Sequence, residues 1–507
     1  MWKVISGPER LVRSLRASPV LAERLSGTEK QILQITAMKI LFLSLLILTA
    51  VPSLFAQSAT VNWNTTYQTM DGFGGMTATY GNSLSGAQAD LFFSATAGIG
   101  MAYVRTANTE DNSIPDLVTL QEATARGALI ELSLMSPPLS IKSSSTWADG
   151  TYGPDGSTCF SSNPSLASNY TTYANYIVNY INTMATSVGA PVSVLGVGNE
   201  PNILHNSYGS CQWTAATIDT FVGKYLGPAL AKAAWNSVQK SSPKLMLPET
   251  SGWFNPDFAS ACLNDSVCAQ YVNIVAAHDY GSGYAPNNGY CCALPSAYPL
   301  GTSSGRHLWM SETNGGLIAN NGSNCPGETW CDDTSMADAL VWAKSIHDFF
   351  TVANASGWQY WELIFSGNLG YWTETNAIAQ RFWAVGNWSK FVRPGWQRIE
   401  ATTNPKSGIY VSAFKDSTNT KFAIVAINQN SSAETVDFSF SGFPSVTSVT
   451  PTLTSASVNL VDQTDTNVSS DAFFYSIPAT SVVTFHGTVS SSSKAPAAPT
   501  NLTVSVH

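Results

Sequence analysis

Charged residues are scarce in this chain. Asp, Glu, Lys and Arg make up 11% of its 507 residues, and acidic residues outnumber basic ones by 33 to 24, so the net charge is -9. A chain with few cations and a net negative charge is a poor match for nucleic acid or an anionic membrane surface. A neutral or weakly charged partner is the more natural expectation.

Motifs for metal sites are missing. The chain has neither a CxxC nor an HExxH motif, and no histidine stands at ligand spacing from the adjacent Cys291 and Cys292. A metal cluster at these two cysteines is an alternative that the spacing disfavours. We therefore expect no cofactor and no metal.

A hydrophobic run long enough to cross a membrane is absent as well. Residues 38–56 carry one lysine followed by an apolar stretch at 40–54, which is typical of a secretory signal and shorter than the roughly 18 residues of a membrane span. We expect a signal peptide at 38–57 and an upstream non-structural segment at 1–37. The protein is then secreted, without a membrane attachment after cleavage. A membrane anchor with a short cytoplasmic tail is the alternative.

The eight cysteines all lie between Cys159 and Cys331. An even number in an exported chain indicates disulfides. Cys262 with Cys268, and Cys325 with Cys331, are spaced like local loop staples. Because eight cysteines allow about 105 pairings, the sequence does not choose among them.

From residue 70 onward, apolar strand-like runs alternate with amphipathic helical stretches such as 166–184, 216–237 and 333–352. Eight strands with intervening helices indicate an α/β fold, the (β/α)8 TIM barrel, which we place at 68–393. A helix is doubtful at 254–262. The runs are 70–75, 101–106, 128–136, 192–200, 244–250, 272–280, 307–313 and 357–364.

After Pro394 the pattern changes to short alternating strands without helices, which predicts an antiparallel β-sandwich side domain. An early run at 59–66 is placed to pair with this late sheet, so the side domain comprises 58–67 plus 394–488. Residues 489–507 read as a linker and the start of a truncated module. The late strands expected are 408–415, 421–429, 435–442, 473–477 and 481–486.

Two glutamates follow short apolar runs that are distant in sequence. Glu200 stands in VLGVGNEPN (194–202), and Glu312 stands in HLWMSETNGG (307–316). At the ends of the fourth and seventh strands of an eight-strand ring, they face one another across the barrel mouth. Two carboxyl groups about 5 Å apart are the equipment of a retaining glycosidase. A lone glutamate at a strand end is more often solvated or salt-bridged.

Seven motifs follow one another along the chain: QTMDGFGGMT (68–77), GIGMAYVR (98–105), SPP (136–138), VGNEPN (197–202), HDYG (278–281), LWMSE (308–312) and SKFVRPGWQRIEAT (389–402). In this order they resemble glycoside hydrolase family 30, especially its bacterial xylanase-like branch. The similarity covers most of residues 58–488, and 404–429 resembles the side domain of that branch. NEP alone would be weak evidence, whereas the combination is specific.

This resemblance implies roles for residues at the barrel mouth. Glu312 is the expected nucleophile, and Glu200 is the expected general acid/base. Burial beside the Glu312 carboxylate is expected to raise the pKa of Glu200, so that Glu200 carries a proton at the start of the reaction. Arg105 and Tyr280 are placed to stabilise the ionised Glu312, although Arg105 could equally be a structural partner of a barrel carboxylate.

The remaining predicted site residues would contact or orient the sugar. Asn199 is expected to hydrogen-bond the sugar 2-hydroxyl, the alternative being a strand-end cap. His278 either orients the site or is a satisfied core histidine. Trp361 offers a flat apolar face to a pyranose ring. Four further tryptophans could build subsites or simply pack in the core: Trp147, Trp213, Trp253 and Trp330.

Two departures from the family pattern bear on the substrate. Met135 stands in LMSPP where relatives often have an aromatic residue. The stretch ELIFSGNLGYW (362–372) lacks the Arg that grips glucuronate in glucuronoxylan-specific relatives. We therefore expect a secreted, monomeric endo-β-1,4-xylanase that acts on polysaccharide without depending on glucuronate. The alternatives are a β-1,6-glucanase, a β-1,6-galactanase, a glucosylceramidase-like exo-enzyme or a non-catalytic polysaccharide-binding protein.

Overall fold

The computed structural model describes residues 57–77, 83–204, 206–280, 294–313, 334–364 and 378–490. The predicted signal peptide at 38–57 and the segment at 1–37 fall almost entirely outside these ranges. So do most of the predicted linker at 489–507, and Cys291, Cys292, Cys325, Cys331 and Trp330. Across the described ranges, none of the helices combines the length and apolarity needed to cross a bilayer.

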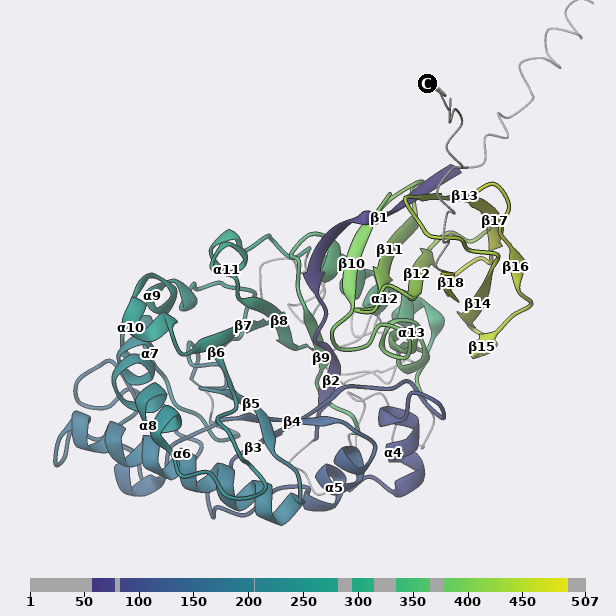
Figure 1. Cartoon of the computed structure of the whole chain (residues 1–507). Coiled ribbons are helices and arrows are strands. Elements are labelled where there is room, and N and C mark those ends of the chain that lie inside the picture. Colours follow the sequence, from purple (N-terminus) through teal and green to yellow (C-terminus); the bar gives the residue numbers. More distant parts are fainter. Residues whose placement is uncertain are drawn as a thin grey trace, which may run out of the picture. The chain divides into compact units, whose positions relative to one another are not determined.

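Eight parallel strands form a closed barrel, as the sequence predicts (Figure 1). All eight predicted runs overlap a barrel strand, although several strands are shorter than the run and β2 and β3 each extend one residue beyond it. Ring closure is completed where the first strand pairs with the last, through Gly72 with Gly357. The barrel strands are β2 (Gly72–Met76), β3 (Tyr103–Ala107), β4 (Leu129–Ser133), β5 (Val192–Gly196), β6 (Lys244–Thr250), β7 (Val272–His278), β8 (His307–Glu312) and β9 (Gly357–Tyr360).

Helices connect the barrel strands and lie outside the ring (Figure 1). Several begin at a residue whose hydroxyl accepts a hydrogen bond from the first turn, such as Ser165, Thr214 and Ser335. The helices are α4 (Gly86–Phe93), α5 (Leu117–Ala125), η1 (Leu139–Ile141), α6 (Leu166–Val188), α7 (Ala215–Phe221), η2 (Val222–Leu226), α8 (Gly227–Lys232), α9 (Ala259–Asn264), α10 (Ser266–Ala269), α11 (Pro299–Ser303), α12 (Met336–Thr351) and α13 (Gln380–Ser389).

One helix prediction needs correction. The stretch 216–237 was expected to be one helix, but it is divided by a π-helical turn at η2 and ends at Lys232. The next residue, Ala233, is extended, with φ -62° and ψ 142°. Beyond it, Asn236 hydrogen-bonds to Asn182 of α6 instead of continuing a helix.

The barrel interior is apolar in its lower part and polar at its mouth. A compact cluster including Tyr103, Met246 and Trp309 fills the interior. The charged residues Arg105, Glu131 and Glu249 are equally buried and stand on β3, β4 and β6. Because side chains of a closed parallel barrel fill its centre, these charged groups have to satisfy one another.

A second sheet carries the strands that follow the barrel, together with the first strand of the described chain. The early strand β1 (Gln57–Thr69) pairs antiparallel with β10 (Gln397–Ala401) and parallel with β13 (Glu434–Ser441). The other strands are β11 (Ile409–Lys415), β12 (Lys421–Asn428), β14 (Ser448–Ser455), β15 (Val458–Asp462), β16 (Thr466–Asn467), β17 (Ala472–Ile477) and β18 (Ser481–Thr488).

This sheet folds over on itself, so the predicted sandwich is present. The strand order is β15-β14-β18-β12-β11-β10-β1-β13-β17, which puts β18 and β13 far apart in hydrogen bonding. Phe485 of β18 nevertheless lies 4.9 Å from Phe438 of β13 and 5.1 Å from Phe473 of β17, measured between ring centroids. The predicted strands are present; β10, β14, β15 and β16 were missed, because their alternation is short or interrupted by Pro451.

Two disulfides join the described cysteines. The predicted pair Cys262–Cys268 is confirmed and connects α9 to α10. The second, Cys159–Cys211, spans 52 residues and was not anticipated. The predicted pair Cys325–Cys331 lies outside the described residues.

Candidate active site

Glu200 and Glu312 meet at the mouth of the barrel. Glu312 is the last residue of β8, and Glu200 follows β5 by four residues. Their exposed fractions are only 5% and 6%. One oxygen of each carboxylate lies, together with a ring nitrogen of His278, in a group whose atoms are all within 4.8 Å of one another. This separation suits a retaining pair of about 5 Å and is too short for the 6.5 Å or more of an inverting pair.

Among the described residues, two side chains donate hydrogen bonds to Glu312. Arg105 of β3 donates from Nη1 to Oε2. Tyr280, two residues beyond β7, donates from its hydroxyl to Oε1 at 3.1 Å. A cation and a neutral donor therefore hold both oxygens of this carboxylate.

Arg105 also binds the residues around Glu312. Its Nη2 donates to Asn199 Oδ1 at 2.9 Å, to Ser133 Oγ at 3.0 Å and to Glu249 Oε1 at 3.0 Å. Its Nε lies 3.3 Å from Glu131 Oε1. Burial by itself lowers the pKa of Arg105, but the carboxylates of Glu312, Glu249 and Glu131 outweigh it and hold that pKa above its ordinary value. The guanidinium stays charged.

The pKa values of Glu131 and Glu249 are shifted in opposite directions. Burial raises the pKa of Glu131 to about 8 and outweighs the attraction of Arg105. For Glu249, burial also acts to raise the pKa, but Arg105 and His278 outweigh it and the pKa is lowered. The interior thus keeps Glu249 ionised and gives Glu131 a proton near neutral pH, which limits the negative charge that Arg105 must balance.

Glu200 has a different set of partners. Tyr208 donates from its hydroxyl to Oε2 at 2.6 Å, and His278 Nδ1 lies 3.3 Å from Oε1. The same His278 nitrogen is 3.6 Å from Glu312 Oε1. Burial acts to lower the pKa of His278, but Glu312, Glu200 and Glu249 raise it to about 9. His278 is therefore a cation between the two carboxylates.

The backbone adopts a left-handed conformation at Glu200, after β5, and at Glu249, near the end of β6. Glu200 and Glu249 have φ of 47° and 56°, and the amide of Glu200 donates to the carbonyl of Glu249 at 3.0 Å. Such left-handed non-glycine residues cost about 1 kcal/mol or more and cluster at functional sites. Gly196 makes room for the arrangement, because a Cβ there would stand 1.9 Å from Glu249 Oε2.

Sequence reasoning missed three of these residues. Glu249 is the last but one residue of β6, in LPET, and Glu131 lies within β4. The rule that located Glu200, a carboxyl at the end of an apolar run, would also have found Glu249. Tyr208 lies in a loop after β5, where no pattern marks it.

The predicted tryptophans separate into two groups. Trp361 and Trp147 pack with Tyr208 against Met76, Ala107 and Met135 near the mouth. Trp213 and Trp253 are buried within the main hydrophobic core. For Trp213 and Trp253, the alternative that they pack in the core is correct, and they do not form sugar subsites.

Two groups of described side chains have the spacing of metal ligands. Glu200, His278 and Glu312 form one, but His278 is protonated and Arg105 contacts the same carboxylate, so little net negative charge is left for a cation. The other includes Cys262 and Cys268, whose sulfur atoms are joined in a disulfide.

Comparison with known proteins agrees with this geometry. Residues 113–291 match the family model of the glycosyl hydrolase family 30 TIM-barrel domain. The chain is 26% identical over 436 residues to the glucuronoxylanase XynC of Bacillus subtilis, covering 85% of this chain and 91% of that one. These matches support glycoside hydrolase family 30, with its xylanase-like members, as the family that the chain is similar to. They indicate a glycoside hydrolase, and enzymes of that family act by retention.

Solved structures of family 30 proteins share the fold of this chain. The family 30 subfamily 8 xylanase Xyn30A from Clostridium acetobutylicum superposes with a TM-score of 0.69 at 27% identity, covering 85% of this chain and 99% of that one. A more distant similarity, 26% over 285 residues, is to a putative glucosylceramidase 1 of Caenorhabditis elegans, covering 52% of this chain and 50% of that one.

Proposed function

We propose that this protein is a secreted endo-β-1,4-xylanase that does not depend on glucuronate, with Glu312 as nucleophile and Glu200 as general acid/base. The observation that carries the proposal is the pairing of two buried carboxylates whose converging atoms lie within 4.8 Å. Each carboxylate is held by one cation and one tyrosine hydroxyl. Glu312 is held by Arg105 and Tyr280, while Glu200 is held by Tyr208 and His278.

In the first half-reaction, a carboxylate oxygen of Glu312 attacks the anomeric carbon. The bond to the leaving sugar oxygen breaks, and that oxygen takes the proton of Glu200. Glu312 then forms an ester and loses its negative charge. In the second half-reaction, Glu200 removes a proton from water, the water oxygen attacks the anomeric carbon, and the Glu312 carboxylate is released.

Asn199 supports the transition state in this proposal. Its Oδ1 accepts from Arg105 at 2.9 Å, so the side chain is oriented and its amide nitrogen is the donor left for the substrate. A hydrogen bond from this nitrogen to the sugar 2-hydroxyl would strengthen as charge develops on the ring. Trp361 supplies an apolar face beside it, together with Trp147.

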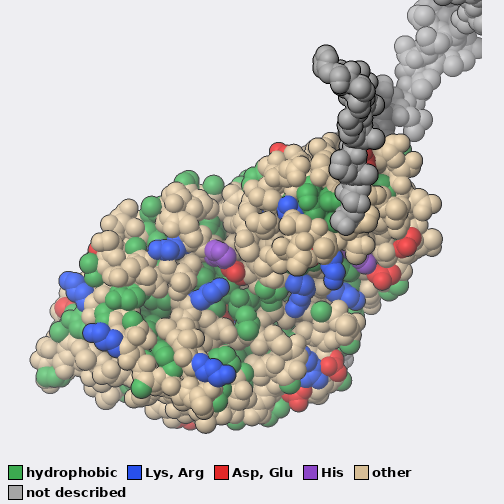
Figure 2. All heavy atoms as spheres, viewed as in Figure 1, with side chains coloured by type: hydrophobic (Ala, Val, Ile, Leu, Met, Phe, Trp, Pro, Cys, Tyr) green, Lys and Arg blue, Asp and Glu red, His purple; other side chains and the backbone are tan. Residues whose placement is uncertain are grey.

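A neutral xylan chain suits the surface and the mouth. Figure 2 shows a largely uncharged face on which few charged side chains appear. The stretch 362–372 contains no Lys or Arg, and its first residue, Glu362, is a fully buried acid. A glucuronate carboxylate would find no cation from this segment. The second candidate is a glucuronoxylan-directed enzyme, favoured by the B. subtilis relative that is named a glucuronoxylanase.

Export is part of the same proposal. It is supported by the signal-like residues 38–56 and by the two disulfides in the described part of the chain, which form readily outside the reducing cytosol. Expression of the full chain in a secreting host, followed by N-terminal sequencing of the medium protein, tests it. A mature protein that starts near residue 57 is the expected result.

The activity is tested with purified protein on unsubstituted xylan, glucuronoxylan, β-1,6-glucan and β-1,6-galactan. We expect xylan and glucuronoxylan to be cut at similar rates into a mixture of oligomers, and NMR to show retained β-configuration in the first product. Glu312→Ala and Glu200→Ala should each be folded and inactive on xylan. With an activated substrate, azide should give the α-glycosyl azide in Glu312→Ala, by one inversion, and the β-glycosyl azide in Glu200→Ala, by net retention. Strong preference for glucuronoxylan would favour the second candidate.

A further inference from the structure

Tyr208 reaches Glu200 from a loop with little regular structure. It lies in the segment between β5 and α7, and its hydroxyl donates to Glu200 Oε2 at 2.6 Å. A loop tyrosine of this kind needs support if its hydroxyl is to stay within hydrogen-bond distance. The support comes from the loop that follows β4.

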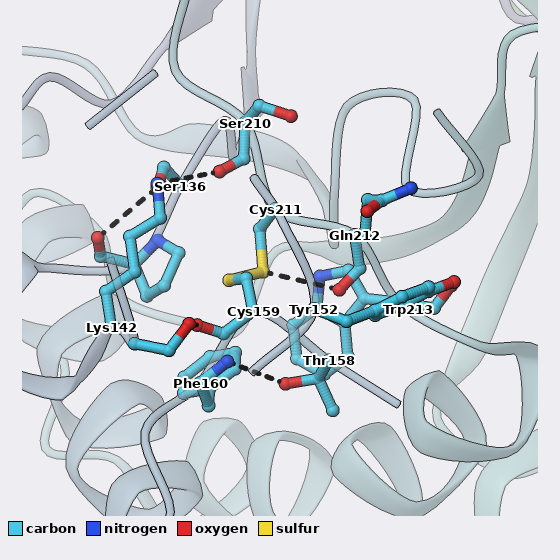
Figure 3. Close-up of a disulfide and its surroundings, with 12 residues drawn as sticks. Ser136, Lys142, Tyr152, Thr158, Cys159, Phe160, Ser210, Cys211, Gln212 and Trp213 are labelled. Carbon is cyan, nitrogen blue, oxygen red and sulfur yellow. Dashed lines mark hydrogen bonds between the residues drawn. A yellow bond between two sulfur atoms is a disulfide. The ribbon is translucent and has the colours of Figure 1, made fainter. Parts of the chain in front are cut away.

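A disulfide and a group of backbone hydrogen bonds join the two loops. Cys211, three residues after Tyr208, is bonded to Cys159 of the loop after β4 (Figure 3). The amide of Cys159 donates to the carbonyl of Gln212 at 3.0 Å, and the amide of Gln212 donates to the carbonyl of Gly150 at 2.9 Å. Thr158 and Trp213 form an isolated bridge beside them.

A buried lysine joins the same loops at a second point. Lys142 is 5% exposed, and all three of its ammonium donors are used. It donates to Ser136 Oγ at 2.9 Å, to the carbonyl of Trp147 at 2.6 Å and to the carbonyl of Ser210 at 2.9 Å. Figure 3 shows this side chain between Ser136 and Ser210. Trp147 and Ser210 flank the position of Tyr208.

Close packing completes the contact around Tyr208. A Cβ on Gly209 would stand 2.2 Å from Trp147 Nε1, so the indole lies directly on the glycine backbone next to Tyr208. Tyr208 itself packs in the mouth cluster with Met135 and Trp361. The loop is therefore fixed on one side by the disulfide, on another by Lys142 and at the mouth by aromatic side chains.

We infer that the Cys159–Cys211 disulfide and Lys142 are positioning elements for catalysis, which hold the Tyr208 hydroxyl on Glu200 and so set the pH range over which Glu200 exchanges its proton. The inference rests on the proposed role of Glu200 as acid/base. A hydrogen bond from Tyr208 is stronger to the carboxylate than to the carboxylic acid. It therefore favours the ionised form, which the second half-reaction needs.

Other groups also act on Glu200, and the experiment has to separate them from Tyr208. His278 contacts Oε1 of Glu200 and also lies near Glu312 and Glu249. Arg105 contacts both of these glutamates, and Tyr280 contacts Glu312. Titration of His278 would change the rate with every substrate. Loss of the Glu200 proton matters only when the leaving group needs that proton.

The test measures kcat/KM against pH for an aryl xylobioside with a poor leaving group, and again with a dinitrophenyl leaving group that departs without a proton. With the poor leaving group, Tyr208→Phe should move the alkaline limb to higher pH by about one unit, because the ionised Glu200 loses a donor. The dinitrophenyl substrate should show no such movement. Cys159→Ala/Cys211→Ala should move the limb in the same direction, and should add nothing further in the Tyr208→Phe background.

The other disulfide is the matched control. Cys262→Ala/Cys268→Ala should leave the alkaline limb in place, although it also removes one disulfide. A folded Cys159→Ala/Cys211→Ala protein with the wild-type limb would overturn the inference. If that variant does not fold, Lys142→Met tests the same inference. A shift of the alkaline limb in Lys142→Met supports the inference, and an unchanged limb overturns it. Full activity of Glu200→Ala would instead refute the proposed function itself.

Discussion

Arg105 and Glu312 are joined by a hydrogen bond from Nη1 to Oε2 across the barrel, from the second barrel strand to the seventh. The same guanidinium group contacts Glu131 and Glu249, so one buried cation contacts three buried glutamates. A planar group with five donors can do this, whereas an ammonium cannot reach several carboxylates in fixed directions.

Arg105→Lys should therefore lower kcat/KM by about 100-fold or more, because the attacking carboxylate loses an oriented donor. It should also lower the free energy of unfolding by about 3 kcal/mol, since buried carboxylates lose their partner. Steady-state kinetics and urea denaturation measure both effects. Arg126→Lys is the control: Arg126 pairs with the more exposed Asp90 and Glu122, and its change should stay within about 1 kcal/mol. Equal effects of the two substitutions would contradict the assignment.

His278 should make stability fall as the solution becomes alkaline. Burial opposes its charge, but Glu312, Glu200 and Glu249 raise the pKa from 6.5 to about 9. The stabilisation is therefore complete below about pH 6.5 and is lost as pH rises through 9, amounting to about 3 kcal/mol. His278→Gln should flatten the dependence of the unfolding free energy on pH in this window. His347→Gln should not, because burial lowers the pKa of His347 to about 3 and it stays neutral throughout.

Glu362→Gln should stabilise the protein at neutral pH. Burial raises the pKa of Glu362 from 4.5 to about 9, with further contributions from Glu312 and Asp116. Neither carboxylate oxygen has a hydrogen-bond partner among the described residues. The folded state holds a proton that the unfolded state releases above pH 4.5, so the wild type loses stability as pH rises towards 9. The increase in the free energy of unfolding caused by Glu362→Gln should be about 3 kcal/mol larger at pH 7 than at pH 4.5. A difference independent of pH would contradict this account.

The two disulfides should contribute unequally to stability. Cys159–Cys211 closes a separation of 52 residues and Cys262–Cys268 one of 6. On the chain-entropy estimate, their removal costs about 4 and about 2 kcal/mol. Urea denaturation of the two double-alanine variants measures the difference. A larger loss from the short bridge would show that loop closure does not dominate.

The barrel could be predicted from sequence because its strands are short apolar runs separated by amphipathic helices. Each of the eight predicted runs overlaps an observed strand, from β2 to β9. The predictions were least reliable for the ends of helices and strands and for interruptions within them. In 216–237, for example, the π-helical turn leaves no periodic signal in the sequence. In the second sheet, β14 was missed because Pro451 interrupts its alternation.

The candidate site was only partly visible in the chain. Glu200 and Glu312 stand out because each is a carboxyl at the end of an apolar run, and strand order in a closed barrel then brings them to one mouth. Trp213 shows the limit of this reasoning: its position suggested a sugar subsite, but it stacks on Tyr170 at 5.8 Å within the core. Burial depends on neighbours that are remote in sequence.

The amino-acid sequence by itself determined the alternation of strands and helices, the family resemblance and the pair of strand-end glutamates, because these follow from local periodicity and short motifs. Only the tertiary structure decided which groups surround each glutamate. Arg105 meets carboxylates from three other strands, and Tyr208 is held on Glu200 through a disulfide to a different loop. Such contacts depend on distances in space between residues far apart in the chain, which local patterns do not encode.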